Sequence, residues 1–132
     1  MQIIRKADAK FVDKQNGTQI HYYLFPEYEL DYNEIAPHTT QDWHAHNTIE
    51  EAIYVISGEL TGEWIEGSEK HQDRLYAGDL VRSEASLHTF SNESDAITKF
   101  IVIKLVLDGK NKRDIFKTDK VTMEGAENWT DQ

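Results

Sequence analysis

The sequence predicts an all-β domain, an antiparallel sandwich or barrel, and two patterns support this prediction. Turn signals recur every eight to twelve residues through most of the chain, as in small β-sandwiches and barrels. Short runs rich in β-branched and aromatic residues lie between these turns, and no long helical period is present. Helical and mixed α/β architectures are therefore not expected.

The strand-like segments can be followed in order along the chain. Residues 18–25 form the first, and it stops at Pro26, which cannot donate a ladder hydrogen bond. Residues 49–57 form the next, and Gly58 provides a turn after it. Further strands are expected over residues 59–66, 70–76, 80–83, 87–90 and 96–107, with turns near Gly67, Gly78 and Gly109.

The chain has the length of one domain, and we expect it to span residues 1–109, with the main barrel over about 37–107. Residues 110–132 are charged and poor in apolar side chains. They are predicted to form a C-terminal arm, either ordered on its own chain or swapped onto a partner.

Composition excludes several classes of function. The chain carries 14 Lys and Arg against 24 Asp and Glu, a net charge of −10, so nucleic acid and anionic membranes are not expected partners. It has no cysteine, which excludes disulfides and thiolate chemistry. The first residues lack an apolar export segment, and the longest apolar stretch is interrupted by Lys104. A cytoplasmic location is therefore expected.

Two of the predicted strands are apolar on both faces. In residues 49–57 and 100–107, apolar side chains occupy both sides of the expected strand. In a sheet with one face in water, apolar and polar residues would alternate along each strand instead. The N-terminal strand, the C-terminal arm or a second copy of the chain must cover the outer face, and we expect a homodimer.

The segment around residue 44 carries a candidate metal site. On an extended strand His44 and His46 point the same way, so both imidazoles can meet one ion. Glu51 follows after four residues, and Gly58 follows Glu51 after six. Imidazoles with a carboxylate suit Fe, Mn, Ni, Zn, Co or Cu. The neighbouring Glu50 is a rival ligand, but Glu51 shares the predicted inward face with Ile53 and Val55.

A second cluster follows in the sequence. Gly78 leads to His88, and Asn92 lies four residues beyond it. Taken alone, His88 is more often a hydrogen-bonded core histidine than a ligand, but its setting between Gly78 and Asn92 favours a ligand, and Asn92 is most simply a turn residue. The other three histidines, His21, His38 and His71, have no supporting spacing and are expected to be structural or exposed.

Together these residues resemble the cupin superfamily, whose motifs are G-x5-H-x-H-x3,4-E-x6-G and G-x5-P-x-G-x2-H-x3-N. His44, His46, Glu51 and Gly58 match the first motif, except that His38 stands at its leading glycine. Gly78, His88 and Asn92 match the second. Glu84 and Ser86 stand near its proline and glycine, in a turn one residue shorter.

The resemblance implies a cupin-type jelly-roll barrel, a double-stranded β-helix, with His44, His46, Glu51 and His88 as ligands of a divalent transition metal. It also implies a small metal-dependent enzyme of dioxygenase, isomerase or decarboxylase type that acts on a small oxygen-bearing organic substrate. Glu51 is then expected to serve catalysis as well as metal binding. The sequence offers no second acid or base beside the ligands, so a non-catalytic module that binds or senses a small ligand is the alternative.

Overall fold

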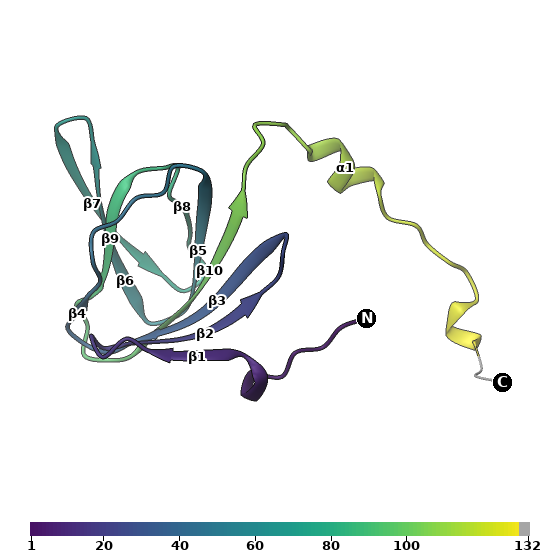
Figure 1. Cartoon of the computed structure of the whole chain (residues 1–132), viewed down its shortest axis with the longest axis horizontal. Helices are drawn as coiled ribbons and strands as arrows, with labels where there is room; N and C mark the ends of the chain where they lie inside the picture. The colour runs from purple at the N-terminus through teal and green to yellow at the C-terminus, as the bar shows by residue number, and fades with distance from the viewer. Residues whose placement is uncertain (130–132) are drawn as a thin grey trace.

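The computed structural model describes residues 1–129, which form a two-sheet β-barrel followed by an extended arm (Figure 1). The strands are β1 (Lys10–Asp13), β2 (Thr18–Leu24), β3 (Tyr28–Ile35), β4 (Thr39–Thr40), β5 (Ile49–Ser57), β6 (Glu59–Glu66), β7 (Glu69–Tyr76), β8 (Leu80–Arg82), β9 (Leu87–Asn92) and β10 (Thr98–Val106). The helical segments are the 3₁₀ turns η1 (Lys6–Asp8) and η2 (Ala126–Asn128) and the helix α1 (Arg113–Thr118). The prediction of an all-β jelly roll is confirmed.

The strands form two antiparallel sheets. One contains six strands in the order β1-β2-β3-β10-β5-β8, and the other contains four in the order β4-β9-β6-β7. The strands predicted from the sequence agree with β2, β5, β6, β7, β8, β9 and β10 to within two residues at each end. The sequence analysis assigned no strand to β3, although β3 pairs with β10 along its whole length.

A compact apolar core lies between the two sheets. Both sheets contribute to it, and its buried members are Ile35, Ile53, Val55, Leu60, Phe90, Phe100 and Val102. In β5 the side chains of odd-numbered residues point inward, so Glu51 continues the face of Ile53 and Val55. A carboxylate is thereby buried on the inner face of β5.

Gly58 makes the tight connection between β5 and β6. Its φ of +83° is a left-handed conformation that favours glycine, and a Cβ at this position would lie 2.6 Å from Oγ1 of Thr98. The Thr98 hydroxyl donates a 2.6 Å hydrogen bond to the carbonyl of Glu59. Gly58 therefore allows β10 to pack against the turn that follows the carboxylate strand.

The outer face of the six-stranded sheet is not covered by the described part of its own chain. Strand β1 extends the sheet at its edge by pairing with β2 rather than lying over the face. Neither α1 nor η2 has a buried residue, and the arm runs away from the barrel (Figure 1). Tyr54 on β5 and Leu80 on β8 are 42% and 57% exposed. Residues 130–132 of the predicted arm lie outside the described residues.

No helix within residues 1–129 is long and apolar enough to cross a membrane.

Candidate metal centre

The two histidines of the first motif lie on an irregular segment that is held against β9. His44 forms an isolated antiparallel bridge with His88, and each backbone N–H donates to the other's carbonyl over 2.9 Å. The rings of His44 and His46 have centroids 5.5 Å apart. The pair is therefore positioned by one bridge rather than by the continuous strand that the sequence suggested.

Glu51 provides the carboxylate of the site. Its side chain is 6% exposed, and its Oε1 lies 3.4 Å from Nε2 of His44 and also contacts Nε2 of His46. One ligand atom from each of these three residues lies within 4.8 Å of the other two. This His-His-Glu group could hold a metal ion.

His88 lies beside this group without being part of it. Its side chain is almost fully buried on β9, and its ring centroid is 4.4 Å from that of His44. The Nδ1 of His88 lies 2.9 Å from the Ser86 carbonyl, and the Nδ1 of His44 lies 3.0 Å from the Asp42 carbonyl. A carbonyl oxygen only accepts, so Nδ1 carries the hydrogen in each ring. In the neutral rings Nε2 then carries the lone pair, as in many metal-bound histidines.

The protonation preferences follow from these contacts. The protonated ring of His44 can donate a hydrogen bond from Nε2 to Glu51, and this raises the pKa of His44 above its ordinary value. Burial works to raise the pKa of Glu51, but the hydrogen bond from His44 and the charges of His44 and His46 outweigh it and lower this pKa. Burial lowers the pKa of His88. A carboxylate and a neutral imidazole are both suitable ligands for a divalent ion.

Two buried atoms test whether the residues fit a metal. Oε1 of Glu51 and Nε2 of His88 are buried, and while the neighbouring imidazoles are neutral neither atom has a hydrogen-bond partner among the described residues. Leaving a buried polar atom without a partner is costly. A cation would satisfy both lone pairs, and two imidazoles with a carboxylate are a common donor set for transition metals. The residues present fit such an ion.

Glu50, the rival ligand, has a different role. Its carboxylate accepts hydrogen bonds from Arg82, from the Ser83 hydroxyl and from the Glu84 backbone N–H, at 2.9 to 3.2 Å. Burial opposes its ionisation, but these hydrogen bonds outweigh burial and keep the pKa of Glu50 below its ordinary value. Glu50 therefore anchors the β8–β9 connection, and Glu51 alone of the two meets the histidines.

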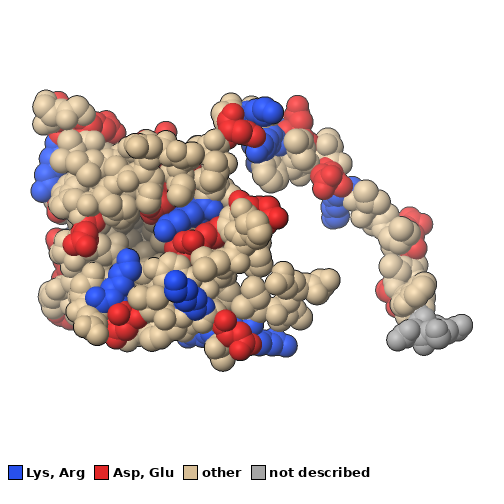
Figure 2. All heavy atoms as spheres, viewed as in Figure 1, with Lys and Arg blue, Asp and Glu red and all other residues tan. Residues whose placement is uncertain are grey.

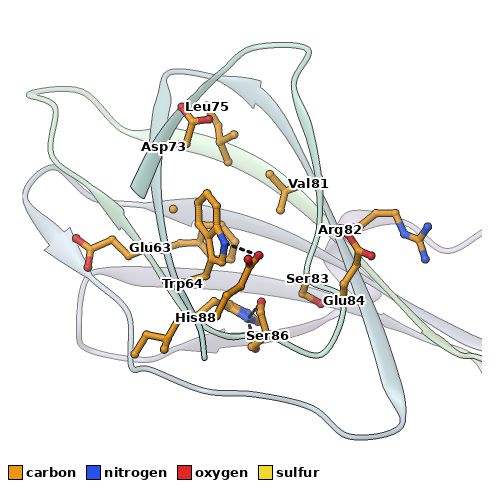
Figure 3. A pocket seen from close by; sticks show the side chains of 14 residues that line it. Glu63, Trp64, Asp73, Leu75, Val81, Arg82, Ser83, Glu84, Ser86 and His88 are labelled. Carbon is orange, nitrogen blue, oxygen red and sulfur yellow. Dashed lines mark hydrogen bonds between the residues drawn. The ribbon is translucent and has the colours of Figure 1, made fainter. Parts of the chain in front are cut away.

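Two cavities adjoin the histidine cluster. The larger, about 500 Å³, is lined by His88 and by apolar groups such as Trp64, Leu75 and Val81 (Figure 3). The Arg82 side chain points away from the centre of this cavity in Figure 3. The smaller, about 340 Å³, is lined by His44, His46 and Glu51. A ligand in the smaller cavity would meet the His-His-Glu group directly.

The smaller cavity also contains ionisable groups that the sequence analysis missed. Asp31 on β3 and Lys104 on β10 both line it. Acidic and basic side chains lie together around a hollow on the face shown in Figure 2. The available signal was the alternation of Glu29, Asp31 and Asn33 with Tyr28, Leu30 and Tyr32, which is a strand pattern with a polar inner face.

The remaining histidines lie outside the centre, as predicted. His21 lies on the outer face between Phe11 and Tyr32, with ring centroids 4.8 and 6.2 Å away. His38 is exposed and lies 2.7 Å from Asp95. His71 stacks on Trp64 at 5.4 Å. Each therefore has a structural or surface role.

Comparisons with solved structures place this fold among known ones. The Drosophila melanogaster CENP-C structure bound to CAL1 has a TM-score of 0.67 and 16% identity, over 76% of this chain and 84% of that one. A structure of FeII HppE has a TM-score of 0.63 and 14% identity, over 80% of this chain and 60% of that one. A recombinant oxalate oxidase in complex with glycolate has a TM-score of 0.65 and 17% identity, over 79% of this chain and 59% of that one.

These identities are low enough that the three likenesses concern the fold alone. A search of curated proteins finds no match to the sequence. The model of the family described as "Cupin domain" matches residues 32–104, which include the His-His-Glu group, His88 and most of both sheets. With more than half of its length matched, the chain belongs to the cupin family.

Proposed function

We propose that this chain is a small metal-dependent cupin enzyme that acts on a small oxygen-bearing organic molecule. The proposal rests on the His-His-Glu group and on Nε2 of the buried His88 beside it, which has no hydrogen-bond partner within residues 1–129. His44, His46, Glu51 and His88 would hold the ion, which is one of Fe, Mn, Ni, Zn, Co or Cu. The cytoplasmic location expected from the sequence stays a prediction.

The residues of the chain prepare this site for a ligand. Carbonyls of Asp42 and Ser86 orient the rings of His44 and His88, which fixes the tautomer of each ring. Glu51 provides a buried negative charge that offsets part of the charge of a cation. A bound divalent ion would supply a Lewis acid for a carboxylate, carbonyl or enediol, and iron would add redox chemistry with dioxygen.

Two proteins that share this fold have chemistry of the proposed class. One is described with iron(II), and another is an oxidase in complex with glycolate, a small hydroxy acid. A cavity of about 340 Å³ next to the His-His-Glu group has room for the small substrates of dioxygenase, isomerase and decarboxylase reactions. We expect Glu51 to be required for turnover, because it lines this cavity and belongs to the group.

Metal analysis tests the first part of the proposal. The protein would be purified anaerobically without a metal-chelating resin, and its metal content measured by mass spectrometry for wild type, His46→Ala and His88→Ala. We expect near-stoichiometric metal in wild type and a large loss in both variants. His38→Ala removes an exposed histidine outside the site and should keep the wild-type content. Near-zero metal in wild type, unchanged by the two site substitutions, would overturn the proposal.

Turnover separates an enzyme from a binding module. Oxygen consumption and isomerisation would be screened over diketones, hydroxy acids and sugars with the metal-loaded protein. Turnover that is lost in Glu51→Gln supports the enzyme. Ligand-induced thermal stabilisation without turnover would instead support a non-catalytic module that binds or senses a small molecule.

We also propose that the chain forms a homodimer through the outer face of the six-stranded sheet. Tyr54, Leu80 and Leu105 expose apolar surface on β5, β8 and β10. Exposed apolar patches of this kind mark interaction surfaces. A second copy is the occupant expected from the sequence, because most soluble oligomers are symmetric assemblies of identical chains.

A further inference from the structure

Asp31 is a buried carboxyl group in the cavity of the candidate metal centre. It lies on β3 with its side chain toward the barrel interior, and the residue is 3% exposed. The cavity that it lines is the one lined by His44, His46 and Glu51. Asp31 is not one of the proposed ligands, so its burial requires another explanation.

The contacts of Asp31 leave half of its carboxyl group unused. Oδ2 lies 3.6 Å from Nζ of Lys104, and Nζ also lies 3.3 Å from Oε2 of Glu29. Oδ1 is buried and has no hydrogen-bond partner among the described residues. A buried acceptor or donor without a partner costs about 1–3 kcal/mol. A polar group of a molecule in the cavity could supply the missing partner.

The charges around Asp31 favour exchange of its proton at neutral pH. Burial, followed by the hydrogen bond with Glu29, raises the pKa of Asp31 to about 7, and Lys104 lowers it only in part. One ammonium group is thus shared by two carboxyls. The groups that face Asp31 are Tyr22 on β2, Glu29 on β3, Lys104 on β10 and, around the cavity, Lys14, Asp42, His44, His46 and Glu51.

We propose that Asp31 is a catalytic acid–base residue that moves a proton on a molecule bound in this cavity. The inference deepens the proposed function and rests on it. The substrate class is a compound with an acidic C–H next to a carbonyl, such as a hydroxy ketone or a diketone. Lys104 is a positioning residue, because it holds the ionised carboxylate through a contact at 3.6 Å.

The proton step balances without an outside oxidant or reductant. Ionised Asp31 takes the proton from the α-carbon, and the C–H electron pair forms the C=C bond of an enolate while the carbonyl oxygen becomes negative. The protonated carboxyl then returns a proton to the same carbon, which regenerates the carbonyl. In a hydroxy-carbonyl isomerisation it returns the proton to the neighbouring carbon instead, while the hydroxyl proton moves to the former carbonyl oxygen and the hydroxyl-bearing carbon becomes the new carbonyl. Asp31 ends the cycle ionised, as it began.

Proton exchange in heavy water tests this role. Metal-loaded wild type, Asp31→Asn and Asp31→Glu would be incubated with dihydroxyacetone or acetylacetone in deuterium oxide, and loss of the α-proton signal followed by NMR. General acid–base residues contribute about 100- to 10,000-fold to rates, so we expect Asp31→Asn to slow exchange at least about 100-fold. Asp31→Glu should restore part of the rate. Asp95→Asn removes an exposed carboxylate outside the cavity and should leave the rate unchanged.

Two further measurements separate this inference from the metal proposal. Metal content of Asp31→Asn should equal that of wild type, because Asp31 is not a ligand. The carboxyl carbon of Asp31 should titrate near neutral pH in wild type by ¹³C NMR, and at higher pH in Lys104→Met. A wild type that binds metal but exchanges the proton no faster than Asp31→Asn would overturn the inference alone. A wild type without metal would contradict the proposed function instead.

Discussion

His44 and His88 are joined both by their backbones and by their rings. Their N–H and C=O groups exchange two hydrogen bonds of 2.9 Å, and their ring centroids lie 4.4 Å apart. The two cupin motifs are thus brought together at the histidines themselves. Because the bridge is made by the backbones, either ring can be altered without removing the contact that holds the strands together.

Replacing His88 with glutamine should therefore weaken metal binding more than it weakens the fold. Loss of groups that only orient metal ligands commonly costs 10- to 100-fold in affinity, so removing a proposed ligand should cost more than about 100-fold. Competition with a chromogenic chelator would measure the affinity for Zn²⁺. Ser86→Ala keeps the carbonyl that accepts from Nδ1 and serves as the matched control. Wild-type affinity in His88→Gln would contradict the assignment of His88 as a ligand.

Asp31 should make the stability of the metal-free protein depend on pH in an unusual direction. Its pKa is raised from 3.8 to about 7 in the folded chain. Between these values the folded state keeps a proton that the unfolded state has released, so stability falls as the pH rises from about 4 to about 7. Asparagine cannot ionise, so its stability does not fall in this way. The free energy of unfolding of Asp31→Asn should therefore rise relative to that of wild type across this window, by on the order of 2 kcal/mol.

Urea unfolding at pH 4.5, 6 and 8 would measure this difference. The gain of Asp31→Asn over wild type should increase with pH and level off above about pH 7. The control Asp95→Asn should show no such trend, because Asp95 is exposed. A gain that is the same at all three pH values would show that Asp31 ionises normally in the folded chain.

The outer face of the six-stranded sheet gives a prediction for the oligomeric state. Tyr54 is 42% exposed on β5, and its strand partner in β10 is the apolar Ile101. Tyr54→Lys places a charge at the centre of the proposed interface and should raise the dimer dissociation constant at least about tenfold, which corresponds to 1.4 kcal/mol. Sedimentation velocity over a range of concentrations would measure it.

Tyr76→Lys is the matched control for this experiment. Tyr76 is also an exposed tyrosine, but it lies on β7 in the other sheet. The Tyr76→Lys substitution should leave the dimer dissociation constant unchanged. A wild type that sediments as a monomer at high concentration would remove the dimer proposal altogether.

The C-terminal arm should be dispensable for the stability of the barrel. Neither α1 nor η2 buries a residue, and Figure 1 shows the arm leading away from the sheets. Deleting residues 110–132 should change the free energy of unfolding by no more than about 0.5 kcal/mol, the usual size of surface effects. Urea unfolding of both forms would test the boundary at residue 109. A loss above about 1 kcal/mol would assign the arm to the folded domain.

Most of the strands and the inward position of Glu51 could be predicted from the sequence, because the patterns that indicate them are local. Alternation along residues 49–57 predicted that Ile53 and Val55 point inward, and both are buried. The same alternation places Glu51 toward the histidines. Turn residues such as Gly58 marked the ends of the strands, since a left-handed φ there favours glycine.

Asp31 and Lys104 were not accessible in this way. The alternation in β3 indicates a strand, but it assigns the apolar side to the interior, whereas Asp31 and Asn33 on the polar side are the buried residues. Lys104 interrupts an apolar strand, and the sequence does not show which group it contacts. Their proximity depends on β3 pairing with β10, which is a long-range feature of the fold.

The shortened turn before His88 is a further departure that only the structure explains. Glu84 and Ala85 have φ values of +49° and +59°, and the Ser86 N–H donates to the Ser83 carbonyl over 3.0 Å. Two consecutive left-handed residues are typical of a type I′ turn, which prefers Asn and Gly. A left-handed conformation costs an L-residue about 1–2 kcal/mol, so this chain holds strained residues next to a proposed ligand.

Ala85→Gly should therefore stabilise the protein. Relief of about 1–2 kcal/mol of strain is offset by about 0.4–1 kcal/mol of added freedom in the unfolded chain, which leaves a gain of about 0.5–1 kcal/mol. Ala77→Gly is the matched control, because Ala77 is also an exposed turn alanine but does not have a positive φ. It should lose stability instead. Equal losses in the two variants, measured by urea unfolding, would show that the turn is relaxed and that Glu50, through its hydrogen bond from the Glu84 N–H, does not hold it in a strained form.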